Sequence, residues 1–164
     1  MRIAIIDSSP LINLTHLGLA GRLSLSFDRI YVPRAVQREV NRKGRFRYRL
    51  NKLYQTGFFL KCLVADETNV RLLRAELDEG EAEALIQAQE KVAMFFIGDE
   101  KRAREIAEKM GLTPVGTVRI LARLNQDGLA AEPKSLVRKL RRDLRFRVSD
   151  RVVDEAIAIA PEPI

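Results

Sequence analysis

The strongest constraint in the chain is a short apolar run that stops at an aspartate and then passes into a second apolar pattern. Residues 3 to 6 are all apolar, and Asp7-Ser8-Ser9-Pro10 follows directly. Such a run predicts a buried strand, and proline is favoured in the first turn of a helix. The pattern therefore predicts a strand, a polar turn and a helix starting near Pro10 that is capped by Ser8 or Ser9. It also places the Asp7 carboxylate at the carboxyl end of a strand, where open α/β sheets bind ligands.

The same order of strand and helix recurs along the chain. "RIYVP" predicts a strand around 30–32 with a helix opening at Pro33, and the apolar run Val92 to Ile97 predicts a strand that ends at Gly98-Asp99. Further strands are expected within 57–65 and 112–115, and helices at 69–76, 78–91, 100–110, 117–127, 134–142 and 149–160. This alternation predicts a three-layer α/β fold in which helices flank a central, mostly parallel sheet of four to five strands.

Length and composition limit the class of protein. A chain of 164 residues, 46% of them hydrophobic, is long enough for one well-buried core. No apolar run approaches the roughly 18 residues that cross a bilayer, so no membrane association is expected. The single cysteine, Cys62, excludes a disulfide framework within the chain and has no partner at zinc-binding spacing. A reducing, cytoplasmic location is therefore expected.

The net charge of +7 is concentrated in two segments. Residues 42–61 hold seven Lys and Arg and no acid, and residues 134–147 hold seven against one acid. The first segment also carries Phe46, Tyr48 and Tyr54, and aromatic rings between cations are typical of surfaces that bind the phosphates and bases of nucleic acid. The alternative is that each segment is only a solvated face that keeps the protein in solution.

Acidic residues follow two of the predicted strands, begin one predicted helix and lie within another. Asp7 and Asp99 come at strand ends, which a parallel sheet brings to one edge. Glu81 and Glu83, at a helix start, follow a loop on the same side, and Glu39 in the helix after Pro33 is expected above that edge. Carboxylates sharing a pocket raise one another's pKa, and a hard divalent cation removes this conflict. Oxygen ligands without a His or Cys cluster favour Mg²⁺ or Mn²⁺.

Each acid also has an ordinary explanation when it is considered alone. Asp7 fits a turn and Asp99 fits the cap of the helix that follows it. Glu39 lies beside a basic run, where a glutamate usually forms a surface ion pair. Glu81 and Glu83 complement the positive end of a helix dipole.

Four blocks of sequence carry a resemblance to a known family. The first is the run from Asp7 to Leu14, which ends in "PLINL", and it is followed in order by "VPRAVQREV", "LDEGEAEALIQA" and "FFIGDEKRAREIAEKMGLTPVGT". Together they resemble a PIN domain, in particular the VapC-like prokaryotic branch whose chains begin D-x-S-x-L-I. The resemblance covers roughly residues 1 to 130 and leaves residues 131–164 as a helical extension expected to pack on the same domain. It implies a metal-dependent endoribonuclease acting on RNA, in many members the toxin of a toxin-antitoxin pair, with an antitoxin protein as partner and a homodimeric assembly.

The resemblance also assigns roles to the acids. It implies that Asp7, Glu39, Glu81 and Asp99 bind the metal and act in catalysis. Glu81 is the glutamate of the "GEAEA" block, and Glu83 is its rival one helical step further round.

Two hydroxyl residues and two departures complete the comparison with the family pattern. Ser9 matches the hydroxyl that braces the first aspartate, and Thr117 matches the Ser or Thr expected to line the pocket. Arg119 replaces the second glycine of a "GTxGIL" pattern, and the basic 42–60 segment is longer than the family pattern suggests. These departures leave the choice of RNA open.

Two other functions fit parts of the pattern. A non-catalytic PIN-fold module that binds nucleic acid or regulates would need the basic segments and not the acids. A phosphate-accepting, receiver-like domain shares the strand-end aspartates, but it needs a lysine near the end of a later strand, and the sequence has none well placed.

Overall fold

The computed structural model describes residues 1–160 and 164. The chain forms two compact units, Met1–Val115 and Gly116–Ile164. None of the helices in the described part of the chain combines the length and the apolar character needed to cross a membrane.

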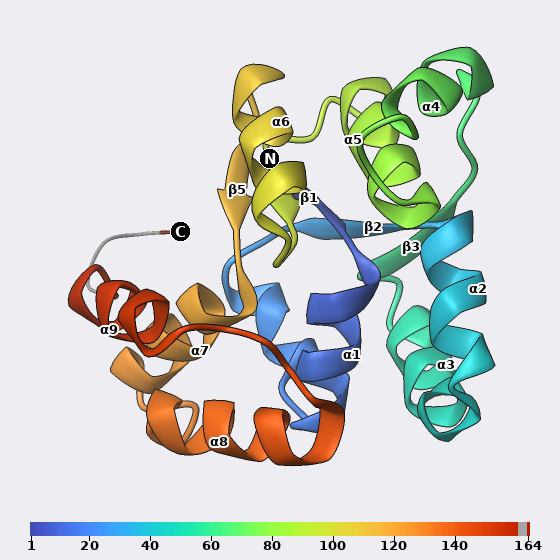
Figure 1. Ribbon diagram of the computed structural model, residues 1–164. Helices are drawn as coiled ribbons and strands as arrows, with labels where there is room; N and C mark the ends of the chain where they lie inside the picture. The colour runs from blue at the N-terminus through green and yellow to red at the C-terminus, as the bar shows by residue number, and fades with distance from the viewer. Residues whose placement is uncertain (161–163) are drawn as a thin grey trace. The chain divides into compact units, whose positions relative to one another are not determined.

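The first unit is built on a five-stranded sheet in which all strands run parallel (Figure 1). The strand order is β3-β2-β1-β4-β5. The strands are β1 (Ile3–Ile6), β2 (Arg29–Pro33), β3 (Phe59–Cys62), β4 (Phe95–Ile97) and β5 (Thr113–Val115). The predicted α/β class with a parallel sheet is therefore confirmed.

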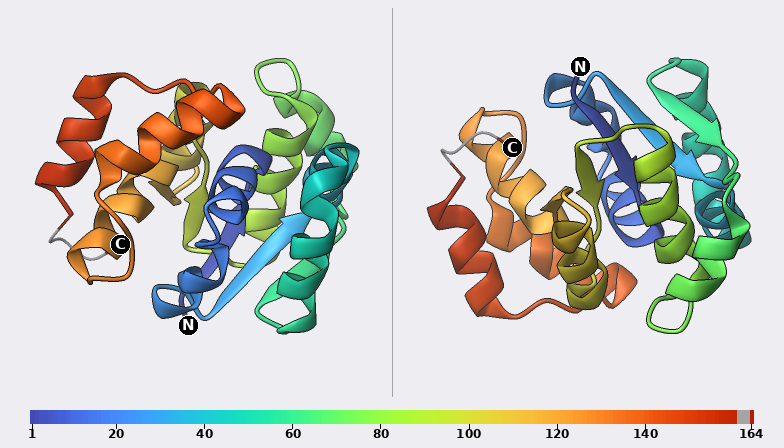
Figure 2. Two further views of the ribbon diagram at one scale, coloured as in Figure 1. Left: turned by 90° about the horizontal axis from the view of Figure 1, so that it is seen from below. Right: turned by 90° about the horizontal axis from the view of Figure 1, so that it is seen from above.

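Helices cover both faces of this sheet. Figure 2 shows α1 on one face and α5 on the opposite face. The helical segments of the unit are α1 (Ser8–His16), η1 (Ala20–Leu25), α2 (Arg34–Arg42), η2 (Gly44–Phe46), α3 (Arg47–Gln55), α4 (Glu67–Leu73), α5 (Glu79–Glu90) and α6 (Lys101–Lys109). Helix α5 packs on β1, β2 and β4, and it also contacts α2 and α4.

The core beneath α5 follows from the alternation of side chains along a strand. Ile5 of β1 and Phe96 of β4 are fully buried and cluster with Ala82 and Leu85 of α5. Residues two apart on a strand share a face. Gly98 therefore follows Phe96 on the same face, and a Cβ at Gly98 would collide with the Phe96 ring. Glycine at this strand end is thus required by packing.

The strand predicted at 92–97 is shorter than the apolar run suggests. Val92 has a φ of 51° and is exposed, and β4 starts only at Phe95. The backbone N–H of Ala93 donates to the carbonyl of Ala88 at 2.8 Å, which ends α5. The first residues of the run are therefore used to close the helix, because its last carbonyls need donors.

The start of α1 also differs from the expected one. Ser8 and Ser9 lie inside the helix, and Asp7 occupies the N-cap position without a side-chain capping bond. The helix therefore begins earlier than Pro10, which sits in its first turn.

Most of the basic 42–60 segment forms η2 followed by α3. Phe46 is buried, and Arg49 donates from its guanidinium to the carbonyls of Thr15 and His16 near the end of α1. This segment is therefore anchored to the first unit.

The second unit consists of α7 (Thr117–Gln126), α8 (Pro133–Leu144) and α9 (Asp150–Ala158). Helix α7 packs against α8 and α9, with Ile120, Leu121 and Leu124 buried. The guanidinium of Arg119 donates to the carbonyl of Ile159 at the end of α9. The arginine that departs from the family pattern thus joins two helices of this unit.

Candidate active site

The candidate site lies where the strand order reverses. The chain adds β2 and β3 on one side of β1, and β4 and β5 on the other. In open α/β sheets a crevice forms at such a switch point, outside the carboxyl ends of the strands. Ile6 pairs with Ile97 in the register of β1 and β4, and the Asp7 N–H donates to the Ile97 carbonyl at 2.9 Å. The Asp7 and Gly98-Asp99 segments therefore leave the sheet side by side, as the sequence predicted for one edge.

The Asp7 carboxylate is enclosed by the first turn of α5. Asp7 is only 4% exposed, and its Oδ1 atom is buried without a hydrogen-bond partner among residues 1–160 and 164. A Cβ at Gly80 would lie 3.4 Å from that atom, and 3.5 Å from a methyl carbon of Val36 on α2. The small residue at position 80 lets α5 approach Asp7 closely, so that one oxygen is removed from water with nothing to bind it.

Glu81 reaches the same place from α5. It forms a capping box with Asp78: the Glu81 N–H donates to Asp78 Oδ1 at 2.8 Å, and the Asp78 N–H donates to Glu81 Oε2 at 3.2 Å. The other oxygen, Oε1, is buried without a partner, and the residue is 5% exposed. Glu81 therefore has a structural role through one oxygen and leaves the second one available.

Neighbouring acids raise the pKa of two carboxyl groups in this crevice. Burial raises the pKa of Asp7 well above its ordinary value, and the charges of Asp78, Glu81 and Glu39 raise it further, against a lowering by the Ser8 N–H. Burial also raises the pKa of Glu81 to about 7, with Asp78, Glu100 and Glu39 adding to the effect. Glu39 thus acts electrostatically on both Asp7 and Glu81, while the joint role of the three acids at a metal stays a prediction.

Asp99 is held by the first turns of α1. The Ser9 hydroxyl donates to Asp99 Oδ2 at 3.1 Å, and the Asn13 amide donates to the same oxygen at 3.3 Å. The family pattern assigned Ser9 to the first aspartate, whereas the structure gives its hydroxyl to Asp99. Asp99 is not the cap of α6, because Glu100 occupies that position.

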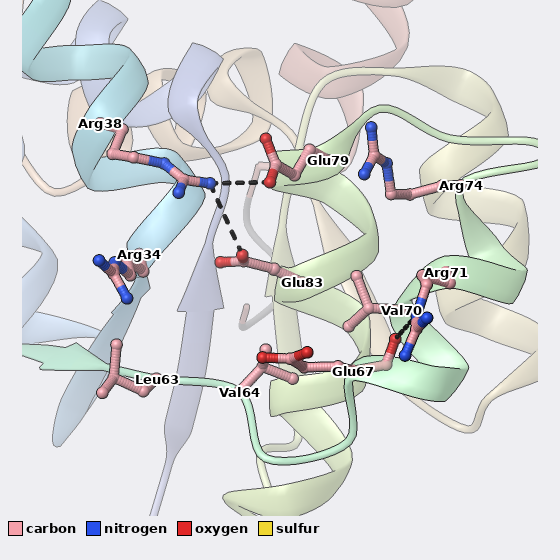
Figure 3. Close-up of a pocket in the computed structure, with 10 residues that line it drawn as sticks. All are labelled: Arg34, Arg38, Leu63, Val64, Glu67, Val70, Arg71, Arg74, Glu79 and Glu83. Atoms are coloured by element: carbon pink, nitrogen blue, oxygen red, sulfur yellow. Dashed lines mark hydrogen bonds and ion pairs between the residues drawn. The ribbon is translucent and has the colours of Figure 1, made fainter.

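Glu83 lies on the other side of α5 from Glu81. Its Oε2 accepts the N–H of Ala35 at 2.8 Å, in the first turn of α2, and its Oε1 lies 4.0 Å from the guanidinium of Arg38. Glu83 is buried and lines a pocket, shown in Figure 3, on that side of the two helices. Of the two rivals in the "GEAEA" block, Glu81 is therefore the one grouped with Asp7.

The remaining expected residue belongs to the second unit. Thr117 is the first residue of α7 and is fully buried. Its proposed part in lining the pocket stays a prediction.

Two residues of the site do not emerge from the sequence patterns considered above. Asn13 lies one helical turn after Ser9 and binds the same carboxylate, but no pattern in the sequence singles it out. Asp78 would pass for a simple complement to the helix dipole. Its spacing from Glu81, an acid three residues before a glutamate at a helix start, is the signal of a capping box and could have identified the pair.

The donor set suits a hard cation, although no cage for one is preassembled. Within residues 1–160 and 164, no group of three or more His, Cys, Asp or Glu side chains is placed to hold a metal ion. Asp7 and Glu81 nevertheless each have one buried carboxylate oxygen without a partner. Burial and nearby negative charges raise the pKa of both side chains, and a cation would offset those charges. Burying an unpaired carboxylate costs several kcal/mol unless it is protonated or paired. Oxygen ligands of this kind match Mg²⁺ or Mn²⁺.

Comparison with known proteins identifies the family of the chain. A family model described as a PIN domain matches residues 3–162, which spans both units of the chain. None of the curated proteins compared with the chain matches it.

Proposed function

Because the chain belongs to the PIN domain family, whose fold is of the nuclease type, we propose that it is a metal-dependent endoribonuclease that hydrolyses RNA phosphodiester bonds. One observation carries the proposal: two buried carboxylate oxygens without partners, on Asp7 and Glu81, lie at the switch point of a parallel sheet. Acids kept in such a place are unfavourable for folding, so a functional reason for them is expected.

The metal would be held by Asp7, Glu39, Glu81 and Asp99. The cation supplies activation of a water molecule and neutralisation of charge on the phosphodiester. Asp7 and Glu81 contribute by giving up their protons when the cation is present, which lowers their raised pKa values. Glu39, half-buried on α2, adds negative charge to the same crevice.

Ser9 and Asn13 act as positioning residues for Asp99. Both donate to Oδ2, which stabilises the ionised carboxylate and fixes its orientation. Preorganisation of this kind removes the cost of ordering the side chain when metal and substrate bind.

The basic α3 region would contact the RNA. Among the aromatic residues Phe46, Tyr48 and Tyr54 of the segment, only Tyr48 offers an exposed ring, at 68% exposure, whereas Phe46 is buried and Tyr54 is half-buried beneath Lys61. The Lys52 ammonium lies 4.6 Å from the Tyr48 ring centroid. An exposed ring beside a cation suits the stacking of an unpaired base whose phosphate is neutralised nearby.

The deciding experiment measures cleavage of single-stranded RNA. We expect cleavage with Mg²⁺ or Mn²⁺, none with EDTA, and a loss of at least about a hundredfold in rate in Asp7→Asn and in Asp99→Asn. Asp154→Asn is the matched control, since this exposed aspartate pairs with Lys134 in the second unit. Circular dichroism would verify that each variant is folded. Cleavage that survives both Asp7→Asn and Asp99→Asn would overturn the site.

A second candidate is a non-catalytic module that binds nucleic acid. The capping box favours it, because Glu81 already has a structural use there. Binding of RNA that falls with salt, with no cleavage and no effect of Asp7→Asn, would support this alternative.

The biological setting belongs to the same proposal. We infer that the protein is the toxin of a toxin-antitoxin pair in the cytoplasm, bound by a small antitoxin and assembled as a homodimer. Growth arrest on expression, relieved by the product of a neighbouring reading frame, would test the first part. The molar mass measured by light scattering would test the second, and a monomer at micromolar concentration would refute it.

A further inference from the structure

An arginine-lined pocket of about 540 Å³ in the first unit has no part in the proposed nuclease site. We call it the arginine pocket. Figure 3 shows Arg34 and Arg38 on α2 along one wall, Arg71 and Arg74 at α4 along the other, and Glu79 and Glu83 of α5 between them. Pockets of roughly 300–1,000 Å³ are the size that holds small molecules and single nucleotides.

The pocket is separate from the site of Asp7 and Glu81. Glu79 and Glu83 are four residues apart and share one side of α5, and Glu81, midway between them, points to a different side. Glu79 and Glu83 line the pocket, while Glu81 belongs to the crevice at the strand ends. A ligand in the pocket would therefore lie across the α2 and α5 pair from the proposed metal.

Two of the three glutamates in the pocket share one arginine. Arg38 donates to Glu79 at 2.8 Å and lies 4.0 Å from Glu83. Glu83 also accepts the Ala35 N–H at the positive end of α2. One cation between two carboxylates leaves this group with one net negative charge, which the positive end of α2 partly offsets.

The charges that remain are mostly positive. The Arg71 side chain donates once, to the backbone carbonyl of Glu67 at 3.4 Å. The Arg34 and Arg74 guanidinium groups make no hydrogen bond or ion pair with any residue that the structure describes, and both residues are exposed. Against these three cations stand the carboxylate of Glu67 and the one net negative charge of the Arg38, Glu79 and Glu83 group, so the four arginines and three glutamates of the lining give a net charge of +1. Guanidinium groups on facing walls suit an anion with several oxygens, which they bind bidentately.

We propose that the arginine pocket binds the phosphate of a nucleotide unit, with Arg34 and Arg74 as its principal contacts. The pocket also has an apolar part, made by Leu63, Val64 and Val70, which suits the sugar or base attached to that phosphate. The identity of the ligand rests on the proposed nuclease function, whereas its charge rests on the pocket alone. The phosphate is supplied either by the backbone of a bound RNA or by a free nucleotide.

The test compares two pairs of arginine substitutions with the same change in charge. The pocket variant combines Arg34→Gln and Arg74→Gln, which removes the two unpaired cations from the lining of the pocket. Arg22→Gln with Arg29→Gln removes two exposed arginines of the same unit that do not line the pocket. Both full-length variants are first compared with the wild type by circular dichroism and thermal unfolding, so that a change in binding is not a change in folding.

Binding is measured in EDTA, where no cleavage is expected, with a short single-stranded RNA and fluorescence anisotropy at several salt concentrations. Loss of Arg34 and Arg74 should weaken binding by at least about tenfold and reduce the salt slope by about 0.7, since the pocket holds one phosphate and each neutralised single-strand phosphate contributes about 0.7. The control pair should change affinity by less than about twofold. Equal effects of the two pairs, or no effect of the pocket pair, would exclude the RNA backbone as the source of the phosphate.

A second arm identifies the source of the phosphate. Adenosine monophosphate is titrated into the wild type and the pocket variant by calorimetry. Binding that disappears in the pocket variant assigns the pocket to a free nucleotide, and a pocket effect seen with RNA alone assigns it to the RNA backbone. If neither probe depends on Arg34 and Arg74, the proposal is refuted.

The outcome is independent of the nuclease test. A chain that binds RNA through these arginines and cleaves none would refute the nuclease and leave the pocket standing. If the chain cleaves RNA but the pocket variant binds RNA and adenosine monophosphate as the wild type does, the proposal for the pocket is refuted and the nuclease proposal stands.

Discussion

The buried carboxylate of Glu81 should make the stability of the metal-free protein depend on pH in an unusual direction. The substitution Glu81→Gln tests this cleanly, because glutamine at the third helical position preserves a capping box with Asp78 while removing the charge. Any pH-dependent difference between the wild type and Glu81→Gln therefore reports the carboxylate and not the loss of the cap.

The direction follows from the raised pKa. Below pH 4.5, the ordinary pKa of a glutamate, the carboxyl is protonated in both the folded and the unfolded chain, so it does not lower the free energy of unfolding. Between 4.5 and about 7 the unfolded chain releases the proton while the folded chain keeps it, so the free energy of unfolding falls as pH rises. Above about 7 the carboxylate is ionised in both states and the loss is complete.

The magnitude is bounded by the same numbers. One pKa unit corresponds to about 1.4 kcal/mol, so a rise from 4.5 to about 7 sets a ceiling of about 3 kcal/mol. Solvent that reaches the crevice screens part of this, and we expect roughly half of the ceiling, about 1.5 kcal/mol. In EDTA at pH 8, Glu81→Gln should thus be more stable than the wild type by about that amount, and at pH 4 the two should be equal.

Urea unfolding followed by circular dichroism, in EDTA at pH values from 4 to 8, measures this difference. Glu79→Gln is the control, since this glutamate lies in the same helical turn but is exposed and paired with Arg38. Adding Mn²⁺ at pH 8 should stabilise the wild type and leave Glu81→Gln nearly unchanged, because a ligand stabilises only the state that binds it. A wild type that gains stability relative to Glu81→Gln between pH 5 and 8 in EDTA would refute the reasoning.

Three further predictions concern other parts of the first unit. Gly98→Ala should lower the free energy of unfolding by about 1–3 kcal/mol in urea titrations, because the new Cβ meets the fully buried Phe96 ring, and an unchanged midpoint would contradict this packing. Asn13→Ala should slow metal-dependent RNA cleavage about tenfold by removing a donor to Asp99, while a rate equal to the wild type would show that the bond does not position the acid. Tyr48→Ala should weaken single-stranded RNA binding about tenfold in EDTA and Tyr48→Phe should not, whereas equal losses would exclude stacking on the ring.

The sequence alone determined the kind and order of the elements and the edge on which the chemistry falls. Apolar runs, proline at helix starts and glycine at helix ends are local signals, and they fixed β1, β2 and β3 and the helices that follow them to within a few residues. Because all strands of a βα chain run parallel, the aspartates after β1 and β4 had to meet at the carboxyl edge. The local signal failed at Val92, where apolar residues close a helix instead of extending a strand.

Only the tertiary structure decided which acids share an environment. The order β3-β2-β1-β4-β5, which creates the switch point at Asp7, depends on pairings between strands that are up to about ninety residues apart and leave no local trace. The same holds for the approach of α5 to Asp7 at Gly80, for the bond from Asn13 to Asp99, and for the facing arginines of α2 and α4. Periodicity specifies which side of an element is buried, whereas long-range packing specifies what that side is buried against, and the chemistry of this protein depends on the second.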